Sequence, residues 1–437
     1  MDILIKRGLA ALTLWFSVNA HAILQIEITQ GIESAAPIAV VPFAWNVPNV
    51  PQPVKLDEVI GNDLRLSGYF NPMSQKDFLS WPTQGSQVRC QDWRMLGAEN
   101  VVIGRVSPIG QIFEVSYELH DVLRCQRIDG LSYRVRAAEL RRLGHQIADQ
   151  VFKMLTGIRG AFATRIAYVV AKKDVKGPVY ELQIADWDGH NPTTILTSRQ
   201  SIISPAWSPD GTKLAYASFE HLPRVPVTVY IQDLEGTRER LFSTNDQVSA
   251  PAWSPDGTQL AVVISRKGER DIHIVDLRTK AVRRLTRSLG TSFTTEPIWA
   301  PDGRSIVYTD DLGGRPQLYR IDVRGGRPQR ISFEGTYNTR ATFSPDGKLL
   351  GMVHGDGAGY HIAVLELATG AFRVLSKTSL DESPSFAPNG SMILFATRDR
   401  GRGVLTAVSA DGRMRQSFSL AEGGDVREPA WGPFLTP

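Results

Sequence analysis

The stretch "PAWSPDGTKLAY", residues 205–216, recurs almost letter for letter as "PAWSPDGTQLAV", residues 251–262. Further copies are "PIWAPDGRSIVY" from Pro297, "ATFSPDGKLLGM" from Ala341, "PSFAPNGSMILF" from Pro384 and a truncated "PAWGPFLTP" from Pro429. The aromatic residue of each copy recurs every 43–46 residues, at Trp207, Trp253, Trp299, Phe343, Phe386 and Trp431. A period of this length is typical of the four-stranded blades of a β-propeller.

One repeat contains everything that a blade needs. Its first residue, Pro in most copies, favours extended geometry before it, and "SPDG" is a tight-turn sequence that ends on a left-handed Gly. Alternating strands follow, such as "KLAYAS" from Lys213, "VTVYIQDLEG" from Val227 and "RERLFS" from Arg238. We therefore interpret the repeated Asp as a turn residue rather than a catalytic group. We interpret the repeated aromatic as packing between blades.

The two ends of the repeat region predict how the ring closes. "RIAYVV", from Arg165, resembles a second strand that no first strand precedes. Conversely, the first strand at Pro429–Trp431 has no successors. One blade is therefore shared between both ends of this region. The sequence predicts a six-bladed, all-β propeller over residues 161–437 whose closure removes exposed sheet edges.

The beginning of the chain predicts export. Lys6 and Arg7 precede the apolar run "GLAALTLWFSV", and Ala20-His21-Ala22 forms a small-x-small cleavage site. This pattern is typical of a secretory signal peptide, here residues 1–22, and the run is shorter than the roughly 18–20 residues that span a bilayer. An uncleaved membrane anchor is the alternative.

Residues 23–160 lack the repeat and mix two periodicities. "LQIEITQG", "PIAVVPF", "NVVIGRV", "IFEVSYELHDV" and "CQRIDGLSYRV" are strand-like. "DEVIGNDLRLSG" is helix-like, and the apolar residues from Leu140 to Met154 recur at helical spacing, with Gly157 as the predicted cap. We expect a small α/β domain over residues 23–160 that includes the opening strand. This strand is either free to bind a partner or, as the alternative, an ordinary edge strand of the domain. Its Cys90 and Cys125 are the two cysteines of the chain. Export permits a disulfide between them, and two separate thiols are the alternative.

Composition and motifs give no support to nucleic-acid binding or catalysis. The net charge is only +4 over 437 residues, and the basic residues form no long block. The sequence has no G-x-S-x-G, no H-E-x-x-H and no cysteine cluster. We therefore predict no catalytic residues, no metal and no cofactor. The alternative function is a propeller enzyme, a lactonase- or peptidase-like hydrolase with a loop-built site at the channel mouth.

Several longer segments resemble one family. "IEITQG", "PIAVVPF", "DLRLSGYFNP", "LTGIRGAF", "TEPIW", "GGRPQRIS" and "LDESPSFAPNG" together are similar to the TolB family, the periplasmic propellers of the bacterial Tol–Pal envelope system. The resemblance implies a monomeric adaptor in the periplasm, peripheral to the membrane through its partners. Its propeller would dock the lipoprotein Pal and support outer-membrane integrity and invagination during cell division.

The same resemblance implies a second contact. The opening strand would engage the C-terminal domain of the inner-membrane protein TolA, and whether further envelope proteins bind is left open. The residues of this candidate strand are Ile26, Glu27, Ile28, Thr29, Gln30 and Gly31.

Strand connectivity indicates where Pal would dock. The segments before each first strand share one face at the channel mouth, and they vary from blade to blade, whereas the SPDG turns on the opposite face barely vary. A docking surface must be specific at each position. The alternative is that the acidic residues cap strands or pair with Arg340 and Arg427 inside the mouth. The candidates are Ser204, Ala250, Thr295, Glu296, Arg340, Glu382 and Glu428.

Overall fold

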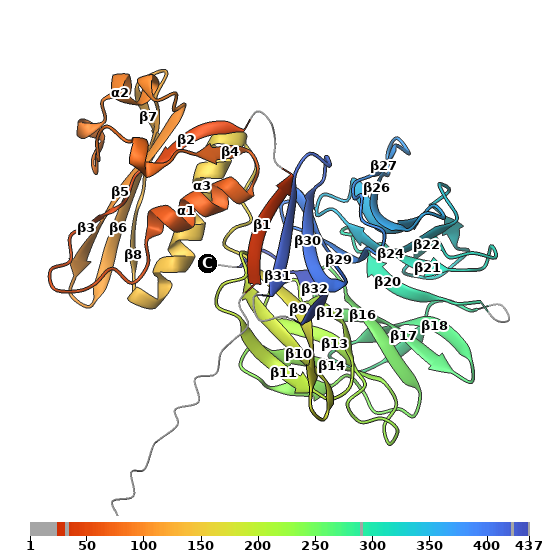
Figure 1. Ribbon diagram of the computed structural model, residues 1–437. Coiled ribbons are helices and arrows are strands. Elements are labelled where there is room, and N and C mark those ends of the chain that lie inside the picture. Colours follow the sequence, from red (N-terminus) through yellow and green to blue (C-terminus); the bar gives the residue numbers. More distant parts are fainter. Residues whose placement is uncertain (1–23, 31–34, 289–291, 421–423, 436–437) are drawn as a thin grey trace, which may run out of the picture.

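The computed structural model describes residues 24–30, 35–288, 292–420 and 424–435. The predicted signal peptide, residues 1–22, lies outside the described residues. An α/β part from β2 to α3, here called the small domain, stands beside a ring of β-sheets, here called the propeller (Figure 1). None of the helices within the described ranges is long and apolar enough to cross a membrane.

The small domain is built on one seven-stranded sheet. Its main path runs β4-β2-β5-β6-β7, with β3 paired to β5 and β8 paired to β6. The pairs of β2 with β4 and β5 are parallel, and the long β5–β6 hairpin is antiparallel. The strands are β2 (Ala36–Val40), β3 (Ala44–Trp45), β4 (Phe70–Pro72), β5 (Asn100–Ile109), β6 (Ile112–Asp121), β7 (Gln126–Asp129) and β8 (Ser132–Val135).

Both faces of this sheet are covered. The long helices α1 (Leu56–Leu66) and α3 (Leu140–Thr156) pack their apolar stripes on the face toward the propeller (Figure 1). Left-handed Gly157 ends α3, as the sequence predicts. The short helix α2 (Cys90–Met95) and the 3₁₀ turns Gln75–Asp77 and Gly85–Gln87 lie on the other side, where Trp93 is fully buried.

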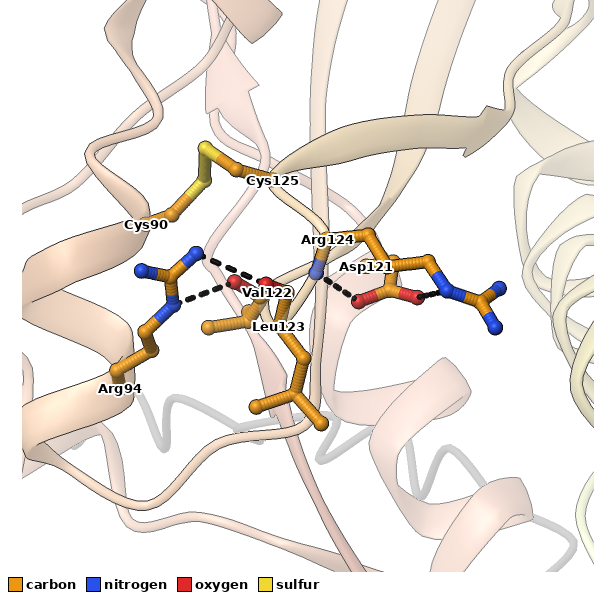
Figure 2. The surroundings of a disulfide bond; sticks show 7 residues. All are labelled: Cys90, Arg94, Asp121, Val122, Leu123, Arg124 and Cys125. Atoms are coloured by element: carbon orange, nitrogen blue, oxygen red, sulfur yellow. Dashed lines mark hydrogen bonds and ion pairs between the residues drawn. A yellow bond between two sulfur atoms is a disulfide. The ribbon is translucent and has the colours of Figure 1, made fainter.

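A disulfide joins α2 to the loop between β6 and β7. Cys90 and Cys125 are bonded with an S–S distance of 1.98 Å (Figure 2). One turn further along α2, the Arg94 side chain donates hydrogen bonds to the carbonyl oxygens of Val122 (3.0 Å) and Leu123 (2.9 Å). A covalent bond and a charged side chain therefore fix the same β6–β7 loop to the same helix.

The propeller has six blades, as the repeat predicts, and each contains a four-stranded antiparallel sheet. In each complete repeat the first strand lies at the channel and the fourth lies outside. Five blades are formed by four consecutive strands each. The first of these consists of β12 (Ile202–Trp207), β13 (Lys213–Ser218), β14 (Thr228–Asp233) and β15 (Arg238–Arg240), and the second of β16 (Gln247–Trp253), β17 (Gln259–Arg266), β18 (Glu269–Asp276) and β19 (Val282–Arg284). The third consists of β20 (Thr295–Trp299), β21 (Ser305–Asp310), β22 (Gln317–Asp322) and β23 (Gln329–Arg330), the fourth of β24 (Tyr337–Phe343), β25 (Leu349–Gly355), β26 (Tyr360–Glu366) and β27 (Phe372–Val374), and the fifth of β28 (Glu382–Phe386), β29 (Met392–Asp399), β30 (Arg402–Ser409) and β31 (Arg415–Leu420).

The remaining blade closes the ring in the predicted way. It contains β9 (Arg165–Asp174), β10 (Gly177–Asp186) and β11 (Thr193–Ser198), and its channel strand is β32 (Asp425–Trp431). Trp431 is paired with Ile166 across the ladder and donates its indole N–H to Thr164 Oγ1 at 3.0 Å. The last strand in chain order therefore completes the first blade.

The opening strand is in a different place from the one expected. β1 (Leu24–Gln30) is not an edge strand of the small domain; it pairs antiparallel with β31 as the fifth strand of a propeller blade (Figure 1). The physical reason is that β31 is the outermost strand of its blade and offers a row of unpaired backbone groups. The small-domain sheet instead begins with β2.

The repeated motif acts structurally at both of its ends. In the turn, the Ser254 hydroxyl donates to the Asp256 carboxylate at 2.6 Å, and the Thr258 amide donates to the same oxygen at 3.0 Å. In the strand, the indole N–H of Trp253 donates to the carbonyl of Ala206 in the preceding blade at 3.1 Å. The Asp therefore shapes the turn and the Trp joins neighbouring blades.

Candidate functional site at the propeller channel

One residue from each blade forms a ring around the channel. Each lies directly before the Pro or Ala that begins the repeat, and each interrupts the ladder between the first and second strands or, in the closing blade, between β32 and β9. All six have left-handed backbone angles, with φ between 48° and 55°. Such angles cost an L-residue about 1–2 kcal/mol. The ring residues are Ser204, Ala250, Glu296, Arg340, Ser383 and Glu428.

Arg340 is the centre of a network across this ring. Its Nε donates to Glu296 Oε1 at 3.0 Å, and its Nη1 donates to Glu428 Oε1 at 3.2 Å. Nη1 also donates to the hydroxyl of Ser383. One guanidinium therefore joins its own blade to three others.

The two carboxylates also bind backbone amides. Glu428 accepts the N–H of Ser204 at 2.9 Å, and Glu296 accepts the N–H of Arg340 at 3.0 Å. The Glu428 side chain is only 8% exposed, and its charge is the main cause that raises the pKa of Arg340 above its usual range. The pairing with Arg340 that the sequence left open is thus present. Arg427 pairs with Asp425 instead, at 3.4 Å.

The network lies between two cavities, and Glu296 and Arg340 line both. The inner cavity, of about 660 Å³, follows the first strands toward the SPDG turns and is lined by Ser204, Ala250, Ser383 and the channel-facing prolines. The outer cavity, of about 700 Å³, is lined by Thr339, Glu382 and Arg427, with Tyr337, Tyr360, Leu380 and Asp425 among the other residues. The outer cavity is the one at the mouth, where the first strands begin.

The structure brings together most of the predicted mouth residues. Ser204, Ala250, Glu296, Arg340 and Glu428 are ring residues. Thr295 and Glu382 each lie one residue before the ring position, and Glu382 is exposed at the outer cavity. The sequence places Ser383 in the mouth segment Glu382–Ser383 but not among the predicted docking residues. In the structure it is the ring residue of its blade, directly before Pro384.

Exposed apolar side chains accompany the outer cavity. Leu380 and Tyr360 line it and are 52% and 42% exposed. Leu312 and Phe333, from loops that strand connectivity places on the same face, are 50% and 72% exposed. Exposed apolar residues at a cavity, such as Leu380 and Tyr360 here, are typical of protein-binding surfaces.

The opening strand has its own geometry. Its register runs from Leu24 opposite Leu420 to Gln30 opposite Arg415, so Ile26, Glu27, Ile28, Thr29 and Gln30 all lie within β1. Gly31 lies outside the described residues. Because β1 is the terminal strand of its sheet, its second edge has no strand partner among the residues that the structure covers.

Neither charged cluster has the geometry of an open metal site. The Arg340 guanidinium occupies the position between Glu296 and Glu428. In the described residues one group, Asp63, His145 and Asp188, has three potential ligand atoms within 4.8 Å of one another. That group already contains a short His–Asp hydrogen bond and an Arg141–Asp188 ion pair, so we assign it no metal.

Comparison with known proteins identifies the family. A model described as "TolB amino-terminal domain" matches residues 24–128, and one described as "TolB beta propeller domain" matches residues 152–435. The chain belongs to the TolB family. A curated relative from Thioalkalivibrio sulfidiphilus, a "Tol-Pal system protein TolB", is 48% identical over 432 residues, which cover 98% of this chain and 98% of the relative. A TolB of Xanthomonas oryzae pv. oryzae is 45% identical over 437 residues, with the same coverage of both chains.

A solved structure agrees. The crystal structure of TolB from Acinetobacter baumannii covers 94% of this chain and 100% of its own, with a TM-score of 0.84 and 40% identity. The described fold is therefore that of a TolB, and the chain is a component of the Tol–Pal envelope system.

Proposed function

We propose that the chain is a non-enzymatic adaptor in the periplasm that binds the lipoprotein Pal at the mouth of the propeller and the C-terminal domain of TolA through β1. By joining these partners it would support outer-membrane integrity and the invagination of the envelope during division. The observation that carries the proposal is the outer cavity, where side chains that differ from blade to blade are held on a repeated backbone.

The mouth has the properties that protein docking requires. Its ring residues are pre-positioned by backbone angles and by the Arg340 network, so little conformational entropy remains to be lost on binding. Apolar Leu380 and Tyr360 and acidic Glu382 are accessible at the same cavity. A partner can thus gain apolar burial and charge-assisted hydrogen bonds at one place.

Glu382 gives the sharper test of Pal docking, because Glu296 is already engaged by Arg340. Substitutions Glu382→Ala and Leu380→Ala should each weaken Pal binding by about 1–3 kcal/mol in isothermal titration calorimetry. The melting temperature should stay unchanged, since both side chains are exposed.

The matched control is Asp256→Ala, in a turn at the opposite end of a first strand, which should leave Pal affinity unchanged. Mouth variants that keep their affinity while the turn variant loses it would show that Pal binds the opposite face.

The TolA contact follows from strand addition. β1 uses one edge to bind β31, and its second edge can receive a strand from a partner. Deleting residues 23–31 should abolish binding to the TolA C-terminal domain and leave Pal binding intact. Unchanged TolA affinity would exclude β1 as the contact without affecting the proposal for the mouth.

A further inference from the structure

A buried polar cluster joins the small domain to the propeller. Asp63 in α1 accepts two hydrogen bonds, from His145 Nδ1 in α3 at 2.7 Å and from the indole N–H of Trp187 at 2.9 Å. Trp187 belongs to the turn after β10, so one carboxylate of the small domain is held from both sides of the junction. Asp63 is 0% exposed and His145 is 2% exposed.

The second nitrogen of the same imidazole faces the propeller. His145 Nε2 lies 3.9 Å from Asp188 Oδ2, and it has no hydrogen-bond partner although it is buried. A neutral imidazole that donates from Nδ1 to Asp63 would present the lone pair of Nε2 to a carboxylate. A protonated ring presents an N–H there instead, so the position between two carboxylates favours the imidazolium.

The geometry argues against a metal ion in the same place. The 2.7 Å separation of His145 Nδ1 and Asp63 Oδ2 is that of a hydrogen bond, and two ligands of one zinc ion stand further apart. The Arg141 guanidinium also contacts Asp188, and a second cation beside it would be repelled. The cluster is therefore a set of ion pairs.

We propose that His145, as an imidazolium between Asp63 and Asp188, is a charged latch that holds the small domain in one orientation against the propeller. It crosses the junction: Asp63 and His145 are in the small domain, whereas Asp188 is in the propeller. The apolar core beneath it also crosses, through Phe152, Phe162, Trp187 and Trp431. Apolar contacts tolerate sliding, whereas directional polar contacts fix one register. The charged ring of His145 adds to two other such contacts across the junction, the Arg141–Asp188 ion pair and the hydrogen bond from Trp187 to Asp63. The latch is independent of the proposed partners.

The surrounding charges are consistent with a charged ring. Burial alone lowers the pKa of His145, but Asp63 and Asp188 outweigh it, and the pKa rises to about 9. Asp188 is held at a pKa of about 2 against the effect of burial, through His190, His145 and Arg141.

The other facing acids respond mainly to desolvation. Burial raises the pKa of Asp63, of Asp186 and of Asp149, the last to about 7. Asp149 also accepts the backbone N–H groups of Phe162 and Ala163, at 2.7 and 3.2 Å. Its titration lies below that of His145.

The sign of the pH dependence follows from the raised pKa. The folded value of about 9 is above the ordinary 6.5, so the contribution of His145 to stability is complete below pH 6.5 and is lost as pH rises through 9. The latch is thus charged at neutral pH and acts as a permanent lock rather than as a pH sensor.

Nuclear magnetic resonance tests the charge directly. In the full chain labelled with ¹⁵N-histidine, the His145 resonances, assigned by their loss in His145→Gln, should report two protonated nitrogens at pH 7 and titrate only above about pH 8. A neutral ring at pH 7 would overturn the proposal.

The orientation is tested with spin labels on both sides of the junction. Labels carried by non-canonical amino acids at exposed Arg89 and Lys176 should give one narrow distance distribution at pH 7. His145→Gln should broaden it, and wild type at about pH 10 should resemble that variant. The matched control is His190→Gln, which removes a half-exposed neighbour of Asp188 and should leave the distribution narrow.

Asp188→Asn is the second variant, and it keeps the test decisive should His145→Gln fail to fold. It removes the propeller charge that faces both His145 and Arg141, while the hydrogen bond between His145 and Asp63 stays intact, and it should broaden the distribution too. Arg141→Gln shows how much of that broadening is due to Arg141 alone. A narrow distribution in a folded latch variant overturns the proposal. So does a rise in the wild-type melting temperature with added Zn²⁺ that His145→Gln lacks, because it would show a metal site.

Discussion

The two ends of the same first strands obey opposite rules. At the turn end, five left-handed positions are filled by glycine, with φ of 69–73°, in every copy from Gly211 to Gly390. At the mouth end, six positions with φ of 48–55° are filled by Ser, Ala, Glu and Arg and never by glycine. Both ends repeat one backbone, but the mouth keeps side chains where the backbone disfavours them.

The difference teaches what each end is for. A turn needs only its geometry, and glycine supplies that without strain. At the mouth the left-handed angles cost about 1–2 kcal/mol per residue, and side-chain contacts can offset this cost where they are made. At Glu296, Arg340, Ser383 and Glu428 the use is visible, since these four share one network.

The largest effect should come from removing residues 427–437. The sixth copy of the repeat lacks the D-G turn, so this blade depends on its mouth end and on the pairing of β32 with β9. The loss of buried Trp431 alone costs about 3–5 kcal/mol, and β9 loses its ladder as well. We expect an aggregating product in size-exclusion chromatography. A truncated chain with a normal melting curve would mean that the ring closes differently.

Arg340→Met should come next. It leaves Glu428 buried without its charged partner, which costs about 3 kcal/mol in chemical denaturation. The double variant Arg340→Met/Glu428→Gln should recover part of this loss, because no unpaired charge remains. If the loss of stability in the double variant equals the sum of the losses in Arg340→Met and Glu428→Gln, the two side chains are not coupled.

Gly257→Ala probes the turn end with a smaller effect. The added Cβ meets only Pro209, at an ordinary 3.7 Å, so the cost arises from the backbone angle of +70° alone. We expect a loss of about 1–2 kcal/mol in the free energy of unfolding. No measurable loss would mean that the turn relaxes to another type.

Ala250→Gly is the reciprocal change at the mouth end of the same strand and should have the smallest effect. Relief of the backbone strain outweighs the extra entropy of glycine in the unfolded chain, so stability should rise by up to about 1 kcal/mol. Calorimetric melting measures the sign. A destabilised variant would show that the Ala250 methyl group packs more usefully than its strain costs.

The sequence predicts periodic features well and unique contacts poorly. The spacing of Trp207, Trp253 and Trp299 was enough to predict blades, and the unpaired strand at Arg165 was enough to predict closure. Left-handed angles at Glu296 and Arg340 could not be predicted, because these residue types carry no signal for them. The six-residue α2 is too short for a helical period to show.

The position of β1 depends on information that a local pattern lacks. "LQIEITQ" is a plain strand, and nothing in its residues says which sheet edge it will join. Similarly, the pairing of His145 with Asp63 joins residues 82 positions apart. Such contacts are determined by tertiary packing, that is, by how helices and strands that have already formed come together.

Ring closure by β32 imposes an order on biogenesis. In chain order β9 is the first strand of the six four-stranded blades, and it receives its channel-side neighbour only when β32, the last strand, is available. Until β32 pairs with β9, the folding chain is an open arc with two unpaired sheet edges, and such edges are templates for aggregation. The longer β32 takes to pair with β9, the longer a chaperone must shield these edges.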